Sequence, residues 1–230
     1  MNRKVLSLTA VAIAVGLSVA ATAGCSAGSS ANAAAPSPAA AQTVADTADY
    51  RPATRDPNPY QFLPKVPSFT LTSKTVRAGR PLPTAQLSGI FGAPGGKDVS
   101  PQLTWSGFPA RTKSFVVSMY DPEAPTGSGF WHWVVADIPA AATSLPENAG
   151  TPGSTVLPSG AFQLGGDAGA ARFIGGAPPK GSGVHDYYVT VTALDVDKSG
   201  VGPTASGALL GFTIGSHTLA RATLVCPTRG

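Results

Sequence analysis

The sequence predicts a mainly β domain of the sandwich or barrel type, on three observations. Several short apolar segments have the length and the alternation of strands, the segments between them are rich in turn-forming residues, and only one stretch favours a helix. The chain contains 27 glycines and 22 prolines among its 230 residues. Many short strands separated by glycine- and proline-rich turns are typical of all-β architectures.

The predicted strands differ in how clearly their side chains alternate. Residues 114–120 and 187–194 alternate in the manner of half-buried strands. Residues 131–136 are bulky and apolar throughout, apart from His132, which indicates a central strand covered on both sides. The complete set of predicted strands is 69–72, 103–105, 114–120, 131–136, 187–194 and 221–226.

One helix is predicted, over residues 203–219. Its alanines and leucines favour a helix, whereas Gly207, Gly211 and Gly215 oppose one.

The N-terminal residues have the pattern of an export signal. Arg3 and Lys4 precede a run without charge, residues 5–23, which ends in small residues. The run is long enough to span a bilayer, but its position and flanks favour a signal peptide, here residues 1–24.

The end of this signal resembles the lipobox of bacterial lipoproteins, in which a cysteine becomes the lipid-bearing N-terminus. Thr22, Ala23 and Gly24 precede Cys25, although a leucine or valine is usual where Thr22 stands. The resemblance implies an exported lipoprotein of the cell membrane, anchored through lipidation of Cys25. The alternative is ordinary cleavage near Ala23, which would give a secreted protein.

Between this signal and the globular domain, the sequence predicts a tether. Residues 25–59 carry the anchoring cysteine and then an Ala/Pro-rich segment, which has too few large apolar side chains to offset the entropy of ordering it. Residues 60–230 are long enough to form one domain with a substantial core.

Charge and cysteine content exclude some classes of function. The net charge is +4, from 16 basic and 12 acidic residues, and the basic residues of 60–230 are scattered. That pattern argues against a nucleic-acid partner. If Cys25 is lipidated, the second cysteine, Cys226, stays a free thiol, which we expect to pack as a small apolar group.

Candidate functional residues lie where predicted strands meet loops. His132 interrupts an apolar strand, His185 follows a Gly/Pro-rich loop, and Asp121 ends the strand 114–120. A buried imidazole needs a polar partner, and a carboxylate can orient an imidazole and favour its charged form. These three side chains predict an anion site, in which the carboxylate fixes the geometry or meets an amine.

Five motifs resemble the phosphatidylethanolamine-binding protein (PEBP) family, most closely its bacterial, Raf-kinase-inhibitor-like branch. In chain order they are SPQLTWSG at 100–107, DPEAP at 121–125, FWHWVV at 130–135, GGAPPKGSGVHDY at 175–187 and GSHTLARATL at 215–224. Together they cover most of residues 65–226.

The resemblance implies an antiparallel β-sandwich with a few short peripheral helices and an anion pocket near one end. It also implies which residues bind the ligand: Asp121, His132, His185, Pro179, Tyr187, Phe130 and Pro125. Phe130 stands where relatives often have Trp, Glu123 where Asp is usual, and Asp186 where Arg or His is common. The last change adds a negative charge, which disfavours dianions and favours a ligand that carries an amine.

The expected function is therefore binding of a phosphate-containing small molecule or a phospholipid headgroup, with a protein partner that the sequence does not identify. Neither catalytic residues nor a metal or other cofactor are expected. Two alternatives remain: a metal-dependent or hydrolytic enzyme that uses the Asp/His/His cluster, and a surface interaction protein with a vestigial pocket. There is no Gly-x-Ser-x-Gly or HExxH motif to support the first.

Overall fold

The computed structural model describes residues 58–230. The predicted signal peptide, Cys25 and the tether up to residue 57 lie outside the described residues.

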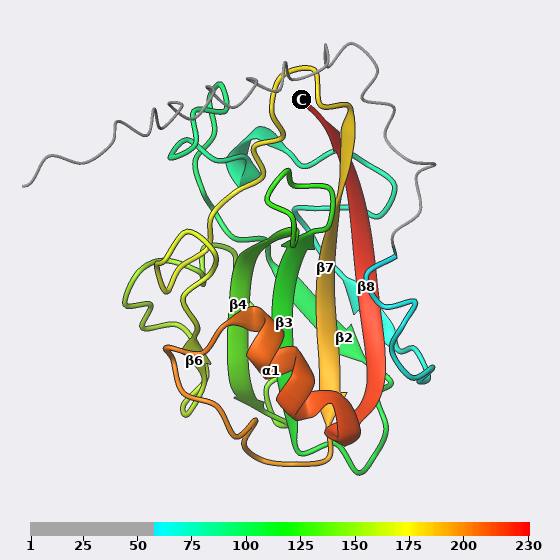
Figure 1. Ribbon diagram of the computed structural model, residues 1–230. Helices are drawn as coiled ribbons and strands as arrows, with labels where there is room; N and C mark the ends of the chain where they lie inside the picture. The colour runs from blue at the N-terminus through cyan, green and yellow to red at the C-terminus, as the bar shows by residue number, and fades with distance from the viewer. Residues whose placement is uncertain (1–57) are drawn as a thin grey trace, which may run out of the picture. The chain divides into compact units, whose positions relative to one another are not determined.

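The described chain forms two antiparallel sheets. Figure 1 shows the strand β2 behind the large sheet and the helix α1 in front of it. The predicted mainly β sandwich is therefore confirmed. In spatial order, the small sheet contains β1 (Thr70–Thr72), β2 (Leu103–Ser106) and β5 (Ser144–Leu145), and the large sheet contains β6 (Phe162–Gln163), β4 (Phe130–Pro139), β3 (Ser114–Asp121), β7 (Val184–Leu194) and β8 (Thr218–Arg229).

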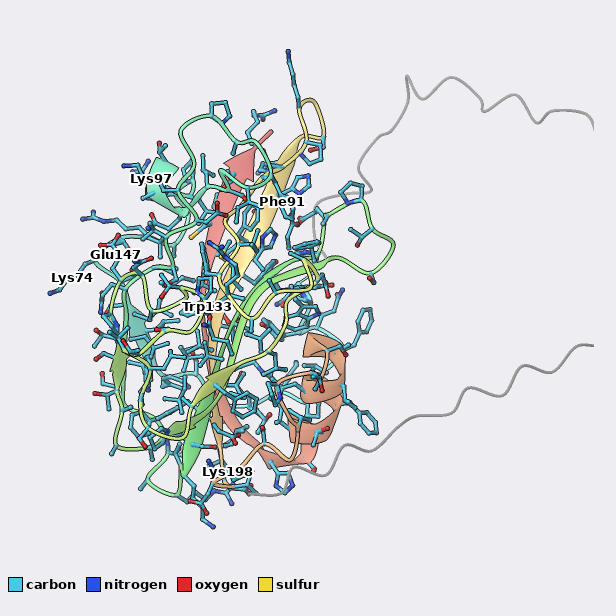
Figure 2. The ribbon with its side chains drawn as sticks, turned by 90° about the vertical axis from the view of Figure 1, so that its left-hand side faces the viewer. Lys74, Phe91, Lys97, Trp133, Glu147 and Lys198 are labelled. Atoms are coloured by element: carbon cyan, nitrogen blue, oxygen red, sulfur yellow. The ribbon has the colours of Figure 1, made fainter. Side chains whose placement is uncertain are left out.

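The main core lies between the two sheets. Trp105 on β2 packs edge-on against Phe115 on β3, with ring centroids 5.4 Å apart. Trp133 on β4 is fully buried and lies in the middle of the molecule in Figure 2. Cys226 on β8 is a free, buried thiol, as predicted. Burial of apolar side chains from facing strands holds the two sheets together.

The helix α1 (Gly207–Ile214) covers the outer face of the large sheet, where Leu210 and Ile214 pack with Val116 and Val134. It begins where the Ser206 side chain accepts a hydrogen bond from the amide of Leu209. It is shorter than the predicted 203–219, because residues before Ser206 form turns and those after Ile214 tighten into a 3₁₀ helix, η3 (Gly215–His217). A second 3₁₀ helix, η2 (Thr84–Gln86), lies outside the strands.

The observed strands are longer than predicted at the end of the large sheet where β3 ends and β4 and β7 begin. β3 ends at Asp121, directly opposite Phe130, with which β4 begins. β7 begins at Val184, three residues before the predicted start, so that His185 lies inside the sheet opposite Thr228. Three strand ends thereby bring together side chains that are distant in the sequence.

Residues 58–230 contain no helix with the length and hydropathy needed to cross a membrane.

Candidate functional site

Asp121 and His185 form a buried pair at this end of the large sheet. The distance between His185 Nδ1 and Asp121 Oδ2 is 2.7 Å, and both side chains are almost fully buried. The hydrogen bond that Nδ1 donates to the carboxylate raises the pKa of His185 above its ordinary value, against the opposing effect of burial. The backbone amide of Glu123 donates to the other oxygen, Oδ1, at 2.9 Å. The carboxylate is therefore held through both of its oxygens.

The second nitrogen of His185 contacts the loop that precedes β7. Its Nε2 lies 2.8 Å from the hydroxyl of Ser182, and that hydroxyl donates to the carbonyl of Pro179 at 2.7 Å. A hydroxyl that donates its only hydrogen accepts at its lone pairs, so His185 Nε2 is the donor. With Nδ1 facing the Asp121 carboxylate, this pattern of hydrogen bonds and the raised pKa of His185 both favour the charged form of the ring.

His132 has the opposite character. Its Nδ1 lies 3.1 Å from the carbonyl oxygen of Ile174, which can only accept, so Nδ1 carries the hydrogen. Burial lowers the pKa of His132 to about 4, although the negative charge of Asp121 acts in the other direction. His132 is thus neutral at pH 7, and its Nε2 is an acceptor. The pKa values of the two histidines of the site are therefore shifted in opposite directions.

Aromatic rings surround His132. Its ring lies 4.8 Å from that of Phe130 and 5.2 Å from that of Tyr187, measured between centroids. Burial, together with the negative charge of Asp121, raises the pKa of Tyr187, so its phenol stays protonated. Phe91 extends the cluster by an edge contact with Phe130, at 5.9 Å, and lies in the upper part of Figure 2, at the opposite end from Lys198. These rings form an apolar wall beside two polar groups, as is usual in small-ligand sites.

The two predicted proline positions are less closely tied to the site. Pro179 is exposed and takes part through its carbonyl, which accepts from Ser182. Pro125 is exposed in the loop between β3 and β4. The structure thus brings together Asp121, His132, His185, Tyr187 and Phe130, and leaves Pro125 at the periphery.

Acidic side chains lie near the Asp121–His185 pair. Glu123 accepts from the amide of Asp186 through Oε2 at 3.1 Å, while its buried Oε1 has no hydrogen-bond partner among the described residues. Burial, with the nearby charges of Asp121 and Asp186, raises the pKa of Glu123. A carboxyl group with a raised pKa and an unpaired oxygen can accept from a ligand that donates hydrogen bonds.

Sequence reasoning missed Asp98, which fastens the loop that positions His132. Its two oxygens accept from the amides of Gly175 (2.8 Å) and Ile90 (3.0 Å). Burial tends to raise the pKa of Asp98, but the hydrogen bonds from Gly175, Ser88 and Ile90 lower it overall. Asp98 has a positive φ of 53°. The only signal in the sequence was its place after Gly95 and Gly96, in a predicted turn.

The loop packs so closely that it requires glycine. A Cβ atom on Gly175 would lie 2.3 Å from the carbonyl carbon of Leu87, and one on Gly176 would lie 2.9 Å from Tyr187 Cζ. Gly175 and Gly176 thus let the loop approach Leu87 and the Tyr187 ring.

No group of three or more histidine, cysteine or carboxylate side chains in residues 58–230 has the geometry to hold a metal ion. The Asp/His/His cluster contains the buried Asp121–His185 pair and a second imidazole, His132, which bonds a backbone carbonyl.

Comparisons with known proteins agree with this architecture. The family model for phosphatidylethanolamine-binding proteins matches residues 72–229. The UPF0098 protein YbcL of Escherichia coli is 46% identical over 161 residues, which are 70% of this chain and 87% of YbcL. A protein of Mycobacterium tuberculosis named "Putative lipoprotein LppC" is 29% identical over 171 residues, which are 70% of this chain and 80% of LppC.

Among solved structures, the crystal structure of E. coli YbcL is described as a new member of the mammalian PEBP family. It superimposes with a TM-score of 0.67 at 45% identity, over 70% of this chain and 98% of YbcL. The sequence match and the fold point to one conclusion: this chain belongs to the phosphatidylethanolamine-binding protein family.

Proposed function

We propose that the protein binds a phosphate-containing small molecule or a phospholipid headgroup at the Asp121/His132/His185 site, and that its role is binding rather than catalysis. The observation that carries the proposal is the different bonding of the two histidines. His185 lies 2.7 Å from the Asp121 carboxylate, which raises its pKa, whereas His132 bonds a backbone carbonyl and has a lowered pKa.

This arrangement suits a ligand that carries both signs of charge. A phosphoryl group can accept from the His185 Nε2–H once the Ser182 hydroxyl turns away. An ammonium group can donate to His132 Nε2 and to Glu123, whose Oε1 has no partner among residues 58–230. The acidic side chains around the site disfavour an inorganic dianion. We therefore expect phosphorylethanolamine to bind more tightly than phosphate.

We also propose that the domain acts at the cell membrane, with Cys25 as the site of lipidation. The support comes from the basic, apolar and small-residue order of residues 1–24 and from the description of LppC as a lipoprotein. A lipid-anchored domain would meet headgroups at the membrane surface.

A histidine-selective NMR titration of the full-length chain with Cys25→Ser tests the binding proposal. The chain has three histidines. With phosphorylethanolamine we expect the resonances of His132 and His185 to shift together, while His217, bonded to Asp195 at 2.9 Å, stays still and acts as an internal control. His185→Asn should abolish the shift of His132. Unchanged resonances of His132 and His185 at millimolar ligand would contradict the proposal.

Cell fractionation tests the anchor. We expect protein with Cys25 in the membrane fraction and the Cys25→Ser variant to be released. Equal release of both proteins would contradict it.

A further inference from the structure

A cavity lies between the large sheet and α1, on the face opposite the Asp121–His185 pair. Its volume is about 330 Å³, and the helix lies across the sheet in Figure 1. The cavity is separate from the site described above because side chains alternate along β3. Val116, Ser118 and Tyr120 line the cavity, whereas Val117 and Met119 belong to the core between the sheets. Asp121 continues that inner row.

The wall of this cavity is mostly apolar. Val116 and Val134 line its floor, while Leu210 and Ile214 line its roof. The segment before β1 closes one side, where the Tyr60 ring packs edge-on against Tyr188 at 6.2 Å and the Tyr60 hydroxyl donates to Thr190 at 2.9 Å. Such a wall favours a hydrocarbon ligand, because binding removes the apolar surfaces of the wall and of the ligand from water.

The mouth of the cavity exposes large apolar side chains. Phe212 on α1 lines the cavity and is 87% exposed. Leu63, in the segment before β1, also lines the cavity and is 43% exposed. Exposed apolar groups gathered around an apolar cavity are typical of ligand-binding surfaces.

One cation lines the cavity without an acidic partner. Arg221 on β8 is half-buried, and its guanidinium lies over the Tyr60 ring, 5.2 Å from the centroid. No hydrogen bond or ion pair joins this guanidinium to another side chain of residues 58–230. Burial lowers the pKa of Arg221, partly offset by Tyr60, as expected of a cation that has lost water without gaining a carboxylate. An anionic group here would replace the lost hydration.

We propose that this cavity binds a single-chain amphiphile with an anionic head, with its alkyl chain between α1 and the sheet and its carboxylate or phosphate on Arg221. The volume is at the lower end of the range for small-ligand pockets, which favours one chain over two. The inference does not depend on the proposed function of the Asp121 site, since the two sites share no side chain.

Isothermal titration calorimetry of the full-length Cys25→Ser chain tests the proposal, with dodecanoate, dodecyl phosphate and dodecyltrimethylammonium below their critical micelle concentrations. We expect both anions to bind at one site, and the cation to bind at least about tenfold more weakly. The ratio of the two anions' affinities distinguishes a fatty-acid ligand from an alkyl-phosphate ligand. Failure of both anions to bind would overturn the proposal.

Matched variants test the role assigned to each part of the cavity. Arg221→Gln should weaken anion binding about tenfold, whereas Arg111→Gln, at an exposed position away from the cavity, should leave it unchanged. Gly211→Leu should weaken binding of all three probes, since Gly211 lines the cavity and a Cβ there meets no atom within 4 Å. Gly202→Leu, also unobstructed, is the control. Equal effects of Arg221→Gln and Arg111→Gln would overturn the assignment of the head group.

NMR locates the ligand independently. Of the three tryptophans, only Trp131 lines this cavity, so its indole N–H signal should shift with dodecanoate while those of Trp105 and Trp133 stay still. His185→Asn and added phosphorylethanolamine should not alter this shift, so that failure of one site is distinguishable from failure of the other. Shifts confined to His132 and His185 would overturn the proposal. The proposal would also be overturned if the protein bound no amphiphile and formed a dimer that Phe212→Ser abolishes.

Discussion

The carboxylate of Asp121 and the imidazole of His185 are 64 positions apart in the chain and 2.7 Å apart in the structure. Both are buried, so the pair joins the end of β3 to the start of β7 where water is largely excluded. Removing one partner from a buried charged pair is costly, because it leaves the other charge uncompensated.

Asp121→Asn should lower the pKa of His185 and destabilise the protein more at pH 6 than at pH 9. The carboxylate raises the pKa of His185 in the folded state. The stability that this shift contributes is therefore fully present below the unfolded-state pKa of about 6.5 and is lost as the pH rises through the folded-state pKa. NMR titration and urea unfolding at the two pH values measure both effects.

The matched control for this prediction is Asp195→Asn. Asp195 pairs with His217 at 2.9 Å, but these side chains are 34% and 44% exposed. A pair this exposed contributes about 0–1 kcal/mol. Equal losses of stability in the two variants would contradict the distinction between a buried and a solvated pair.

Protonation of His132 should make the protein less stable as the pH falls from about 6.5 to about 4. Its pKa is lowered in the folded state, so the unfolded chain binds more protons in this window and stability rises with pH. The full effect corresponds to roughly 3 kcal/mol. Urea unfolding of wild type and His132→Gln should show a difference in stability that changes across this window and is flat above it. A constant difference would count against the neutral, buried state of His132.

Trp105 and Trp133 should respond differently to replacement by phenylalanine. Both are fully buried. Trp133 Nε1 donates to Gln163 Oε1 at 2.8 Å, whereas the buried Trp105 Nε1 has no partner among residues 58–230. Trp133→Phe leaves a buried carbonyl unpaired and should cost about 1–2 kcal/mol more than Trp105→Phe, which removes a donor that is already unpaired. Thermal and urea unfolding of the two variants measure the difference.

Replacement by alanine should lower the stability of the protein at Gly175 and raise it at Gly211. Gly175→Ala places a Cβ atom 2.3 Å from backbone, so it should destabilise the protein by about 2 kcal/mol and displace the loop behind His132. Gly211→Ala, in α1, meets nothing within 4 Å and should stabilise the helix by about 0.5–1 kcal/mol. Calorimetric unfolding measures both. A loss of stability at Gly211 would show that this helical position is not open.

The sequence predicted the parts of the fold that depend on local pattern. Residues 131–136 were expected to be covered on both sides, and β4 is buried on both faces from His132 to Ile138. The start of β7 at Val184 was missed, because residues 184–186 include a histidine and an aspartate that resemble loop positions. Their place in the sheet depends on pairing with β8, which the local sequence does not encode.

The sequence indicated which residues form the candidate site, but not how the pKa values of its two histidines differ. His132 and His185 are the same residue type, yet burial lowers the pKa of His132 whereas the Asp121 carboxylate raises that of His185. Asp121 is 64 positions from His185, so the local sequence does not show this difference. Asp98 was missed for the same reason, since its bond to Gly175 spans 77 positions.

The alternation of side chains along β3 has a consequence for how the protein can diversify. Val117, Met119 and Asp121 contribute to one side of the large sheet, and Val116, Ser118 and Tyr120 to the other. Substitutions at odd positions therefore change the side that carries Asp121, and substitutions at even positions change the side that lines the cavity under α1. The two sides of the sheet can thus be altered separately within one strand.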